Sequence, residues 1–303
     1  MEQKNVRPIS PDFFIIGTPK SGTTWVWECI NYHPELFCFN EIDLHLNLKG
    51  AFGSLLNKAN MIYGQTKNTT FAEFNYEPHQ FDKSDLTEIT NTLWKNAIAR
   101  APKDAKMYGE KNPPYTSRIE EMATTYPNAK FIHIVRDPRD VAISFRDYMH
   151  TEKYFFESHN NKSINTLSEH ETGFNADDQV MMMNSVTGWK KDQLAVETVK
   201  QRFSGRVYTI RYEDMTDPST INGAFSFLGV KTSVEMCEMI LQITDVEKRT
   251  KSPHSFFKRG KSGGHKDLGH DFVQYIEKIV GEQMEHYKYT QSNPLQLVST
   301  NVK

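Results

Sequence analysis

The feature that most constrains this chain is a glycine-bearing polar loop that directly follows a short apolar run. The run covers residues 13–16 (FFII), and the loop reads GTPKSGTTW over residues 17–25. Apolar residues then recur at helical spacing as far as Ile30, so this stretch predicts a strand, a loop and an amphipathic helix. Gly22 lets the backbone approach an anion, toward which the N–H groups of the helix N-terminus point. The loop is therefore predicted to bind phosphate.

Charged and hydroxyl side chains favour this interpretation over a turn that needs glycine for geometry alone. The four side chains are those of Lys20, Ser21, Thr23 and Thr24. A nucleoside-triphosphatase loop, G-x-x-x-x-G-K-[ST], places its Lys after the second Gly and its Ser or Thr on magnesium. Here Thr23 occupies that Lys position, and no later apolar strand ends in an Asp suited to hold the metal. The loop thus suits a nucleotide that needs no magnesium, and no metal is expected.

Short apolar runs alternate with helical periodicity along the rest of the chain. Further strands are expected at residues 105–110, 130–135 and 206–211. Helices are expected at residues 85–100, 115–126, 141–148, 180–203, 217–228, 233–241 and 272–287. Asp85 and Glu88 form a capping box for the first of these, and Asp217 and Gly229 bound the fifth. The alternation predicts an α/β fold, a central parallel β-sheet flanked by helices.

Composition favours one ordinary globular domain. The chain has 303 residues, of which 38% are hydrophobic and 24% charged, and no linker divides it, so we expect a single domain with its core at about 12–290. A net charge of -2 argues against a general nucleic-acid partner. The three cysteines have no paired spacing, so we expect neither a disulfide framework nor a cysteine-rich metal site. No leader or membrane-spanning run is apparent, and a cytoplasmic location is expected.

Residues 19–25 (PKSGTTW) resemble the 5′-phosphosulfate loop of the sulfotransferase family, whose donor is 3′-phosphoadenosine 5′-phosphosulfate (PAPS). Arg136 at the end of a strand and Ser144 in the next helix are similar to the residues with which this family contacts the 3′-phosphate. Arg suits this role because its planar fork meets phosphate oxygens bidentately. The alternative is a helix start at which Asp137 is the N-cap and Arg136 forms a surface ion pair. The resemblance extends from about Asp12 to His286.

Other segments resemble the donor site less closely. Tyr212, in a Y-E-D segment, matches a Tyr near the adenine, Trp25 matches the stacking aromatic, and Thr244 more weakly matches an adenine contact. A late basic loop is similar to the R-K-G-x-x-G motif that closes over the 3′-phosphate. Its residues are Lys258, Arg259, Gly260 and Lys261, with the first two basic residues in swapped order and His265 where the family usually has Trp. The alternative for this loop is a solvated run of charge.

The general base is inferred by comparison between two branches of the family. Cytosolic members use a His in K-T-H-x-P, but residues 109–113 (GEKNP) place Lys111 at that point. The heparan-sulfate and tyrosylprotein branch carries an E-K-x-P-like segment and takes its base from a Glu, whose counterpart is Glu41. Because its segment is apolar, this carboxylate is expected to be partly buried, which would raise its pKa toward neutral pH. The alternative is a structural Glu paired with a Lys or Arg, and Asp43 and His45 are reserve candidates.

These residues predict in-line sulfuryl transfer from PAPS to a hydroxyl or amine of a small molecule. Glu41 would take the acceptor's proton, while Lys20 and Lys111 stabilise the developing negative charge. One rival reading is a P-loop nucleotide kinase or hydrolase, and another is a non-catalytic nucleotide-binding protein. Residues 57–81 are expected to form a long ordered loop near the acceptor, and residues 151–178 a mobile lid or loop. The sequence identifies neither the acceptor nor the oligomeric state, and no membrane partner is expected.

Overall fold

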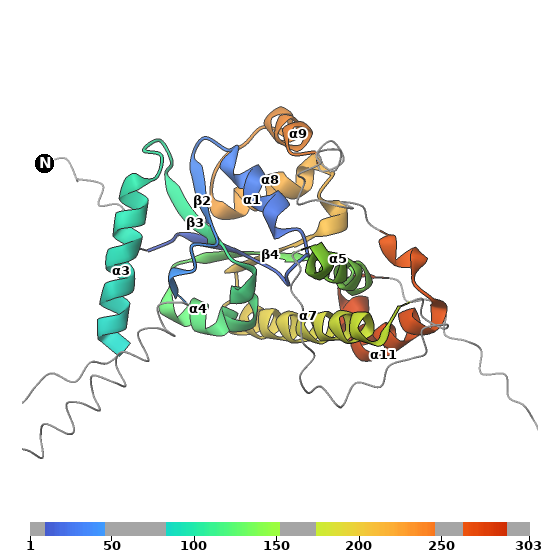
Figure 1. The fold of residues 1–303 in the computed structure, drawn as a ribbon. Helices are drawn as coiled ribbons and strands as arrows, with labels where there is room; N and C mark the ends of the chain where they lie inside the picture. Colours follow the sequence, from blue (N-terminus) through green and yellow to red (C-terminus); the bar gives the residue numbers. More distant parts are fainter. Residues whose placement is uncertain (1–9, 46–82, 152–173, 246–262, 290–303) are drawn as a thin grey trace, which may run out of the picture.

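A five-stranded parallel sheet forms the centre of the structure (Figure 1). The computed structural model describes residues 10–45, 83–151, 174–245 and 263–289. The strand order is β2-β3-β1-β4-β5, and every neighbouring pair is parallel. The strands are β1 (Phe13–Ile16), β2 (Leu36–Asn40), β3 (Met107–Lys111), β4 (Lys130–Val135) and β5 (Val207–Arg211). The predicted α/β fold with a central parallel sheet is confirmed.

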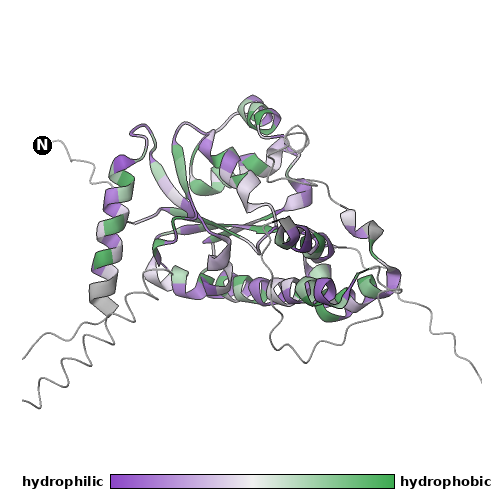
Figure 2. Ribbon diagram, viewed as in Figure 1, coloured by the Kyte–Doolittle hydropathy of each residue, from purple (hydrophilic) through white to green (hydrophobic). Residues whose placement is uncertain are grey.

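The middle strands are apolar because helices cover both of their faces. All four residues of β1 are fully buried, and β1 pairs with β4 so that Ile15 lies opposite Ile132. In Figure 2 the strands at the centre carry mostly hydrophobic residues, whereas the long helix α7 alternates between the two kinds. A parallel strand buried on both faces reads as a continuous apolar run, and this is the signal that made β1 and β4 predictable.

Helices lie in two layers about the sheet (Figure 1). One layer holds α1 (Thr23–Asn31), α8 (Pro218–Leu228) and α9 (Val234–Ile243), which pack on Phe13 and Ile15. The other layer holds α4 (Ile119–Thr125) and α7 (Ala176–Arg202), which pack on Phe14 and Ile16. The remaining elements are α3 (Lys83–Arg100), α5 (Pro138–Thr151), α11 (His270–His286), and the 3-10 helices η2 (Pro113–Arg118), η3 (Tyr212–Asp214) and η4 (Gly264–Asp267).

Several helix ends follow the capping residues that the sequence indicates. The side chain of Asp217 accepts the amide of Ser219 at the start of α8, and Gly229 ends that helix with φ 96°. Ser233 caps α9 in the same manner. The three cysteines are buried and free, as expected for core residues.

Other predicted boundaries were wrong. The helix predicted over 85–100 begins at Lys83, so Asp85 lies inside α3 and does not open it. The helix predicted over 115–126 is divided into η2 and α4, because two prolines begin the segment with a tighter turn. The strand predicted over 105–110 is β3 at Met107–Lys111, and β2 was not predicted as a strand at all.

Two predicted loops lie outside the described residues. These are residues 57–81 and most of residues 151–178, although Ala176 begins α7. That residues 1–303 form one domain stays a prediction for the same reason. Among the described residues, no helix is both long and apolar enough to cross a membrane.

Candidate functional site

The candidate residues follow the carboxyl ends of the five strands, which meet at one edge of the parallel sheet. Gly17 follows β1, Glu41 follows β2, Lys111 ends β3, Arg136 follows β4 and Tyr212 follows β5. In open α/β sheets ligands bind at this edge, and β1 lies where successive connections turn to opposite sides of the sheet. Residues far apart in sequence are thereby brought together.

The phosphate loop leaves an uncapped helix N-terminus and an unpartnered hydroxyl. Gly22 adopts a left-handed conformation with φ 99°, and no side chain caps α1 at this point. The first amides of α1 therefore have no partner within the helix. Ser21 is fully buried, and its Oγ has no hydrogen-bond partner among the residues that the structure describes. A buried polar group of this kind fits an anion, which supplies the acceptor that the hydroxyl otherwise lacks.

Two residues that the sequence did not single out hold the base of this loop. The amide of Gly17 donates to Thr116 Oγ1 at 2.7 Å, and the hydroxyl of Thr18 donates to Asp192 Oδ2, also at 2.7 Å. Burial raises the pKa of Asp192 to about 6. A side chain at Gly17 would place Cβ 2.5 Å from the carbonyl oxygen of Ile134, so only glycine fits there. Thr116 and Asp192 lie 99 and 174 residues from their partners, so no local sequence pattern indicated them.

Arg136 connects the phosphate loop to the end of β5. Its guanidinium donates to the carbonyl oxygen of Lys20 at 3.2 Å and lies 4.4 Å from the centre of the Tyr212 ring. Lys20, which has φ 75°, places its ammonium 4.5 Å from the centre of the Tyr148 ring. Both cations therefore lie against aromatic faces, which attract them electrostatically.

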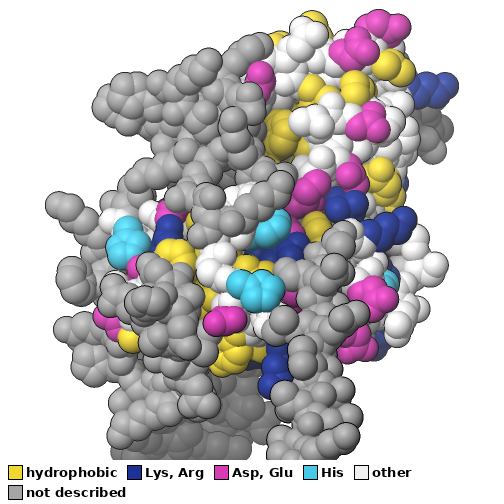
Figure 3. Space-filling model, turned by 90° about the vertical axis from the view of Figure 1, so that its right-hand side faces the viewer, with side chains coloured by type: hydrophobic (Ala, Val, Ile, Leu, Met, Phe, Trp, Pro, Cys, Tyr) yellow, Lys and Arg dark blue, Asp and Glu magenta, His cyan; other side chains and the backbone are white. Residues whose placement is uncertain are grey.

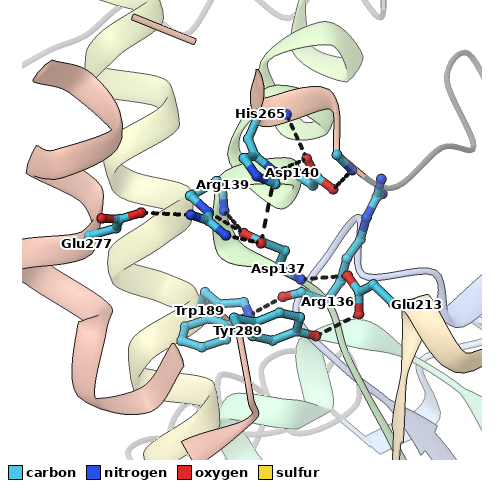
Figure 4. Close-up of polar contacts among 10 residues, drawn as sticks. Arg136, Asp137, Arg139, Asp140, Trp189, Glu213, His265, Glu277 and Tyr289 are labelled. Atoms are coloured by element: carbon cyan, nitrogen blue, oxygen red, sulfur yellow. Dashed lines mark hydrogen bonds and ion pairs between the residues drawn. The ribbon is translucent and has the colours of Figure 1, made fainter. Parts of the chain in front are cut away.

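The backbone around Arg136 is fixed by two other elements, α7 and η3 (Figure 4). Trp189 on α7 donates to the carbonyl oxygen of Arg136 at 3.0 Å, and the amide of Asp137 donates to Glu213 at 3.1 Å. Asp137 also caps α5, since its carboxylate accepts the amide of Arg139 at 2.9 Å. That part of the alternative interpretation is correct, whereas Arg136 is buried and does not lie on the surface.

Aromatic side chains pack behind the loop. The rings of Trp25 and Tyr212 meet edge to face with centroids 5.6 Å apart. The indole N–H donates to Thr244 Oγ1 at 3.1 Å, and that hydroxyl donates to the carbonyl oxygen of Ile240. Thr244 is fully buried, so it orients the Trp25 ring, and a contact between Thr244 and adenine stays a prediction.

Glu41 and Lys111 form an ion pair at the ends of β2 and β3. The Lys111 ammonium donates to Glu41 Oε1, and the amide of Glu41 donates to the carbonyl oxygen of Lys111 at 2.9 Å. The Lys111 side chain is 3% exposed, whereas that of Glu41 is 51% exposed. The expected burial of Glu41 was therefore wrong, because the chain turns outward after β2 with φ 49° at this residue. The ion pair with Lys111 is the feature that the alternative interpretation of Glu41, a structural residue paired with a Lys or Arg, expects; its role as the base stays a prediction.

The reserve candidates are placed differently. Asp43 has φ 51° and accepts a hydrogen bond from the amide side chain of Asn112 at 3.0 Å. His45 is buried between the rings of Tyr115 and Tyr126 and lies 3.4 Å from a carboxylate oxygen of Glu121. Because His45 is enclosed by these partners, it is less accessible to an acceptor than Glu41.

The sequence analysis also missed Glu110, which lies beneath this turn. Its fully buried carboxylate accepts the amide of Asp43 at 2.6 Å and the hydroxyl of Tyr115 at 3.1 Å. Burial raises its pKa to about 7, against the opposing effect of these hydrogen bonds. An acidic residue inside the buried strand β3 was the available signal, since such a group is costly to bury without a role.

The remaining donor-site candidates are less fully described. Ser144 is partly buried on α5, two turns after Arg136. Residues 258–261, which include Lys258, Arg259, Gly260 and Lys261, lie outside the described residues. On the face shown in Figure 3, the described basic, acidic and histidine side chains are intermixed, in agreement with a net charge near zero.

Comparison with known proteins identifies the family. A profile described as the sulfotransferase family matches residues 11–233, about three quarters of the sequence. The chain belongs to the sulfotransferase family. This sulfotransferase is not matched by any curated protein sequence.

Three solved structures share its fold at low sequence identity. Mouse sulfotransferase SULT7A1, solved with PAP (3′-phosphoadenosine 5′-phosphate), is 16% identical with a TM-score of 0.51. The match covers 92% of this chain and 85% of that one. A sulfotransferase from Alicyclobacillus acidocaldarius is 15% identical with a TM-score of 0.52, over 92% and 94% of the two chains. The sulfotransferase domain from the curacin biosynthetic pathway is 18% identical with a TM-score of 0.51, over 89% and 97%.

Proposed function

We propose that this sulfotransferase takes its sulfuryl group from PAPS and transfers it to a hydroxyl or amine of a small molecule. The observation that carries the proposal is the anion cradle after β1, in which the buried Ser21 hydroxyl lacks a partner among the described residues and the α1 N-terminus is uncapped. Arg136 and Lys20 add two positive charges beside it, and the Arg136 guanidinium donates to the backbone carbonyl oxygen of Lys20 at 3.2 Å. Such a cradle suits the dianionic phosphosulfate group of a nucleotide, bound by backbone amides and by charge.

The donor contacts divide between two ends of the nucleotide. Lys20, Ser21, Gly22, Thr23 and Thr24 would hold the 5′-phosphosulfate, because they form the loop and the first turn of α1. The 3′-phosphate would be held by Arg136, Ser144 and the basic residues of the segment 258–261, and the adenine by Trp25 and Tyr212. PAPS supplies a sulfuryl group that leaves with PAP (3′-phosphoadenosine 5′-phosphate) as the other product.

Glu41 is the general base of the proposed reaction. Its carboxylate is half exposed, so the hydroxyl or amine of an acceptor can approach it, and it lies next to the buried ammonium of Lys111. Glu41 accepts the acceptor's proton, and Lys111 and Lys20 provide fixed positive charge where negative charge develops. Neither cation needs to move far, since each is already held by a described partner.

A binding comparison tests the donor. The purified protein is titrated with PAP and, separately, with ATP and magnesium, while its unfolding temperature is followed. We expect PAP to raise that temperature more at equal concentration, because a ligand that binds only the folded state stabilises it. A larger rise with ATP and magnesium would favour a P-loop kinase or hydrolase and contradict the proposal.

A turnover assay then tests catalysis. PAPS is incubated with the enzyme and a panel of phenols, alcohols and amines, and the release of PAP is followed. At least one acceptor should give PAP at a rate well above the rate without acceptor. If PAP binds but no acceptor class is sulfated, the interpretation as a non-catalytic nucleotide-binding protein is favoured.

A further inference from the structure

The end of β3 supports the turn that carries Glu41, beyond the point where β2 and β3 pair as strands. Their register ends with Asn40 opposite Lys111, and the amide of Glu41 then donates to the carbonyl oxygen of Lys111 at 2.9 Å. Two residues further on, the amide of Asp43 donates to a side chain of β3, the carboxylate of Glu110, at 2.6 Å. The Glu110 side chain therefore continues the hydrogen bonding that the backbone of β3 provides to β2.

Three consecutive residues at the end of β3 contact this turn from two sides. Side chains alternate between the faces of a strand, so Glu110 and Asn112 share a side and Lys111 lies on the other. Glu110 binds the amide of Asp43, and Asn112 binds its carboxylate at 3.0 Å. Lys111 binds the carboxylate of Glu41. The turn is thus held at both of its acidic residues by one short segment.

The turn needs such support because its backbone is strained. Glu41 has φ 49° and Asp43 has φ 51°, a left-handed conformation that is unfavourable for residues other than glycine and persists only where contacts hold it. Without a hydrogen-bond acceptor for the Asp43 amide, the turn should relax and carry the Glu41 carboxylate away from Lys111. A general base works only within about 3 Å of the proton that it takes, so a small displacement is costly to catalysis.

Glu110 is itself firmly held. Its side chain is fully buried, and Oε2 accepts the hydroxyl of Tyr115 at 3.1 Å while Oε1 accepts the Asp43 amide. Tyr115 is also fully buried, packs edge to face on the ring of Phe14 in β1, and accepts the amide of His45 at 3.2 Å. A fully buried carboxylate with both oxygens engaged is out of reach of a substrate. Glu110 can therefore act on the reaction only through the turn.

We propose that Glu110 is a positioning residue for the general base, which it holds in place through the amide of Asp43. The inference rests on the proposed function, in which Glu41 takes the proton of the substrate hydroxyl or amine. The role of Glu110 differs from that of Lys111, whose ammonium touches the base directly. Glu110 supplies an oxygen at a fixed place to accept a backbone amide, so a neutral amide oxygen at the same place should serve as well.

Glu110→Met and Glu110→Gln form the matched pair for the test. Both replace the carboxylate by an unbranched side chain of similar length, but only Gln keeps an oxygen that accepts the Asp43 amide. With the best substrate of the panel, kcat should fall by about tenfold or more in Glu110→Met and by less than about threefold in Glu110→Gln. The dissociation constant of PAP, measured by calorimetry, should stay within about threefold of the parent value in both.

Asp12→Ala is the control for loss of a carboxylate that binds β3. Asp12 precedes β1 and accepts the amide of Tyr108 at 2.8 Å, near the amino end of β3 and thus at the opposite edge of the sheet from Glu41. In this variant kcat and the PAP dissociation constant should both stay near the parent values. Unfolding temperatures are measured for every variant, so that a loss of stability alone is recognised.

A second comparison separates positioning of the base from general damage to the site. Glu110→Met is combined with Glu41→Gln, which removes the proton acceptor. The combined variant should keep the kcat of Glu41→Gln alone to within about twofold, because the losses of residues that act as a unit are not additive. If Glu110→Met does not fold, Tyr115→Phe takes its place in both comparisons, since it removes the hydroxyl that holds Glu110.

Amide hydrogen exchange gives a readout that does not depend on turnover. A peptic fragment covering residues 41–45 should exchange faster in Glu110→Met and at the parent rate in Glu110→Gln, because only Met leaves the Asp43 amide without its hydrogen-bond acceptor. Equal kcat in the Met and Gln variants, or additive losses in the combined variant, would overturn the inference, and so would a Glu41→Gln enzyme as active as the parent. A parent that releases no PAP with any substrate class would instead contradict the proposed function.

Discussion

At the scale of single residues, backbone strain is concentrated at the candidate site. Four described residues other than glycine have positive φ, and three of them are Lys20, Glu41 and Asp43, while Lys288 follows α11. A left-handed conformation costs on the order of 1 kcal/mol or more for such residues, and it persists only where neighbouring contacts hold it. Arg136 holds the carbonyl of Lys20, and Glu110 holds the amide of Asp43. An observed strain of this kind supports a functional interpretation of these turns.

The first prediction concerns Glu41. Glu41→Gln keeps the size of the side chain but removes the proton acceptor, so transfer to the best acceptor of the panel should fall by about a hundredfold to ten-thousandfold. PAP affinity should change little, because Glu41 is not among the proposed donor ligands. Steady-state PAP release and calorimetry measure the two quantities. Turnover that stays near the parent value across pH, with loss in Asp43→Asn, would move the base to Asp43.

The second prediction concerns the ionisation of Glu110. Its folded pKa of about 7 lies above the usual value of 4.5, so the folded protein retains a proton that the unfolded chain releases as pH rises between these values. The contribution of Glu110 to stability is therefore fully present below about pH 4.5 and is lost as pH rises through 7. Glu110→Gln, which keeps an acceptor for the amide of Asp43, should avoid that loss.

The size of this effect can be measured at two pH values. The quantity to compare is the free energy of unfolding of Glu110→Gln minus that of the parent. This difference should be about 3 kcal/mol larger at pH 8 than at pH 4.5. Denaturant unfolding of both proteins at each pH gives this difference, and other titrating groups cancel between them. A difference that does not depend on pH would show that folding does not raise the pKa of Glu110.

At the scale of elements, the unit of strand, loop and helix at β1 depends on close packing with η3. A Cβ at Gly22 would lie 2.3 Å from the Tyr212 ring, and Gly22 also has φ 99°. Gly22→Ala should therefore destabilise the protein through both strain and collision, by about 2 kcal/mol or more. Gly205→Ala is the matched control, since Gly205 has φ 79° but no atom within 4 Å of its Cβ position. If the two variants lose equal stability in denaturant, the packing of Tyr212 on Gly22 does not contribute.

The elements that could be predicted carry strong local signals. β4 was predicted at its observed bounds because four apolar residues, interrupted only by His133, follow Lys130, and α8 because Asp217 and Gly229 mark its ends. β2 was missed because its residues lead without a turn signal into the polar turn at Glu41. The start of α3 was misplaced because a capping box two residues inside the helix resembled an N-terminus.

The candidate site was predictable where a motif is local and not where partners are distant. The loop from Gly17 to Trp25 and the Arg136 turn were recognised from the order of their own residues. The sequence could not indicate three other features: Asp192, Thr116 and the contact between Asp140 and His265. Each of them joins segments about 100 residues or more apart. The exposure of Glu41 was misjudged because apolar neighbours in sequence do not fix the direction of the chain after a strand.

At the scale of the whole molecule, the proposed donor site joins parts from both ends of the chain. The phosphate loop precedes α1, Arg136 precedes α5, Tyr212 begins η3, and Gly263 precedes η4. Contacts at the sheet edge connect these parts, from Arg136 to the loop and to Tyr212, and from Asp140 to Gly263. A ligand that contacts several of them should stabilise them together.

The last prediction follows from this joint stabilisation. Saturating PAP should slow amide hydrogen exchange in three separate segments, 17–25, 136–144 and 263–268, because opening any of them then requires loss of ligand contacts. The helix α3, which lies at the opposite side of the structure from η4 in Figure 1, should exchange at an unchanged rate and serves as the internal control. Mass spectrometry of peptic fragments measures all four segments in one titration, with AMP in a parallel one. AMP should protect 17–25 but leave 263–268 close to the free rate, since it lacks the 3′-phosphate. Protection by PAP confined to 17–25 would mean that the C-terminal segment takes no part in donor binding, even if the loop after β1 does.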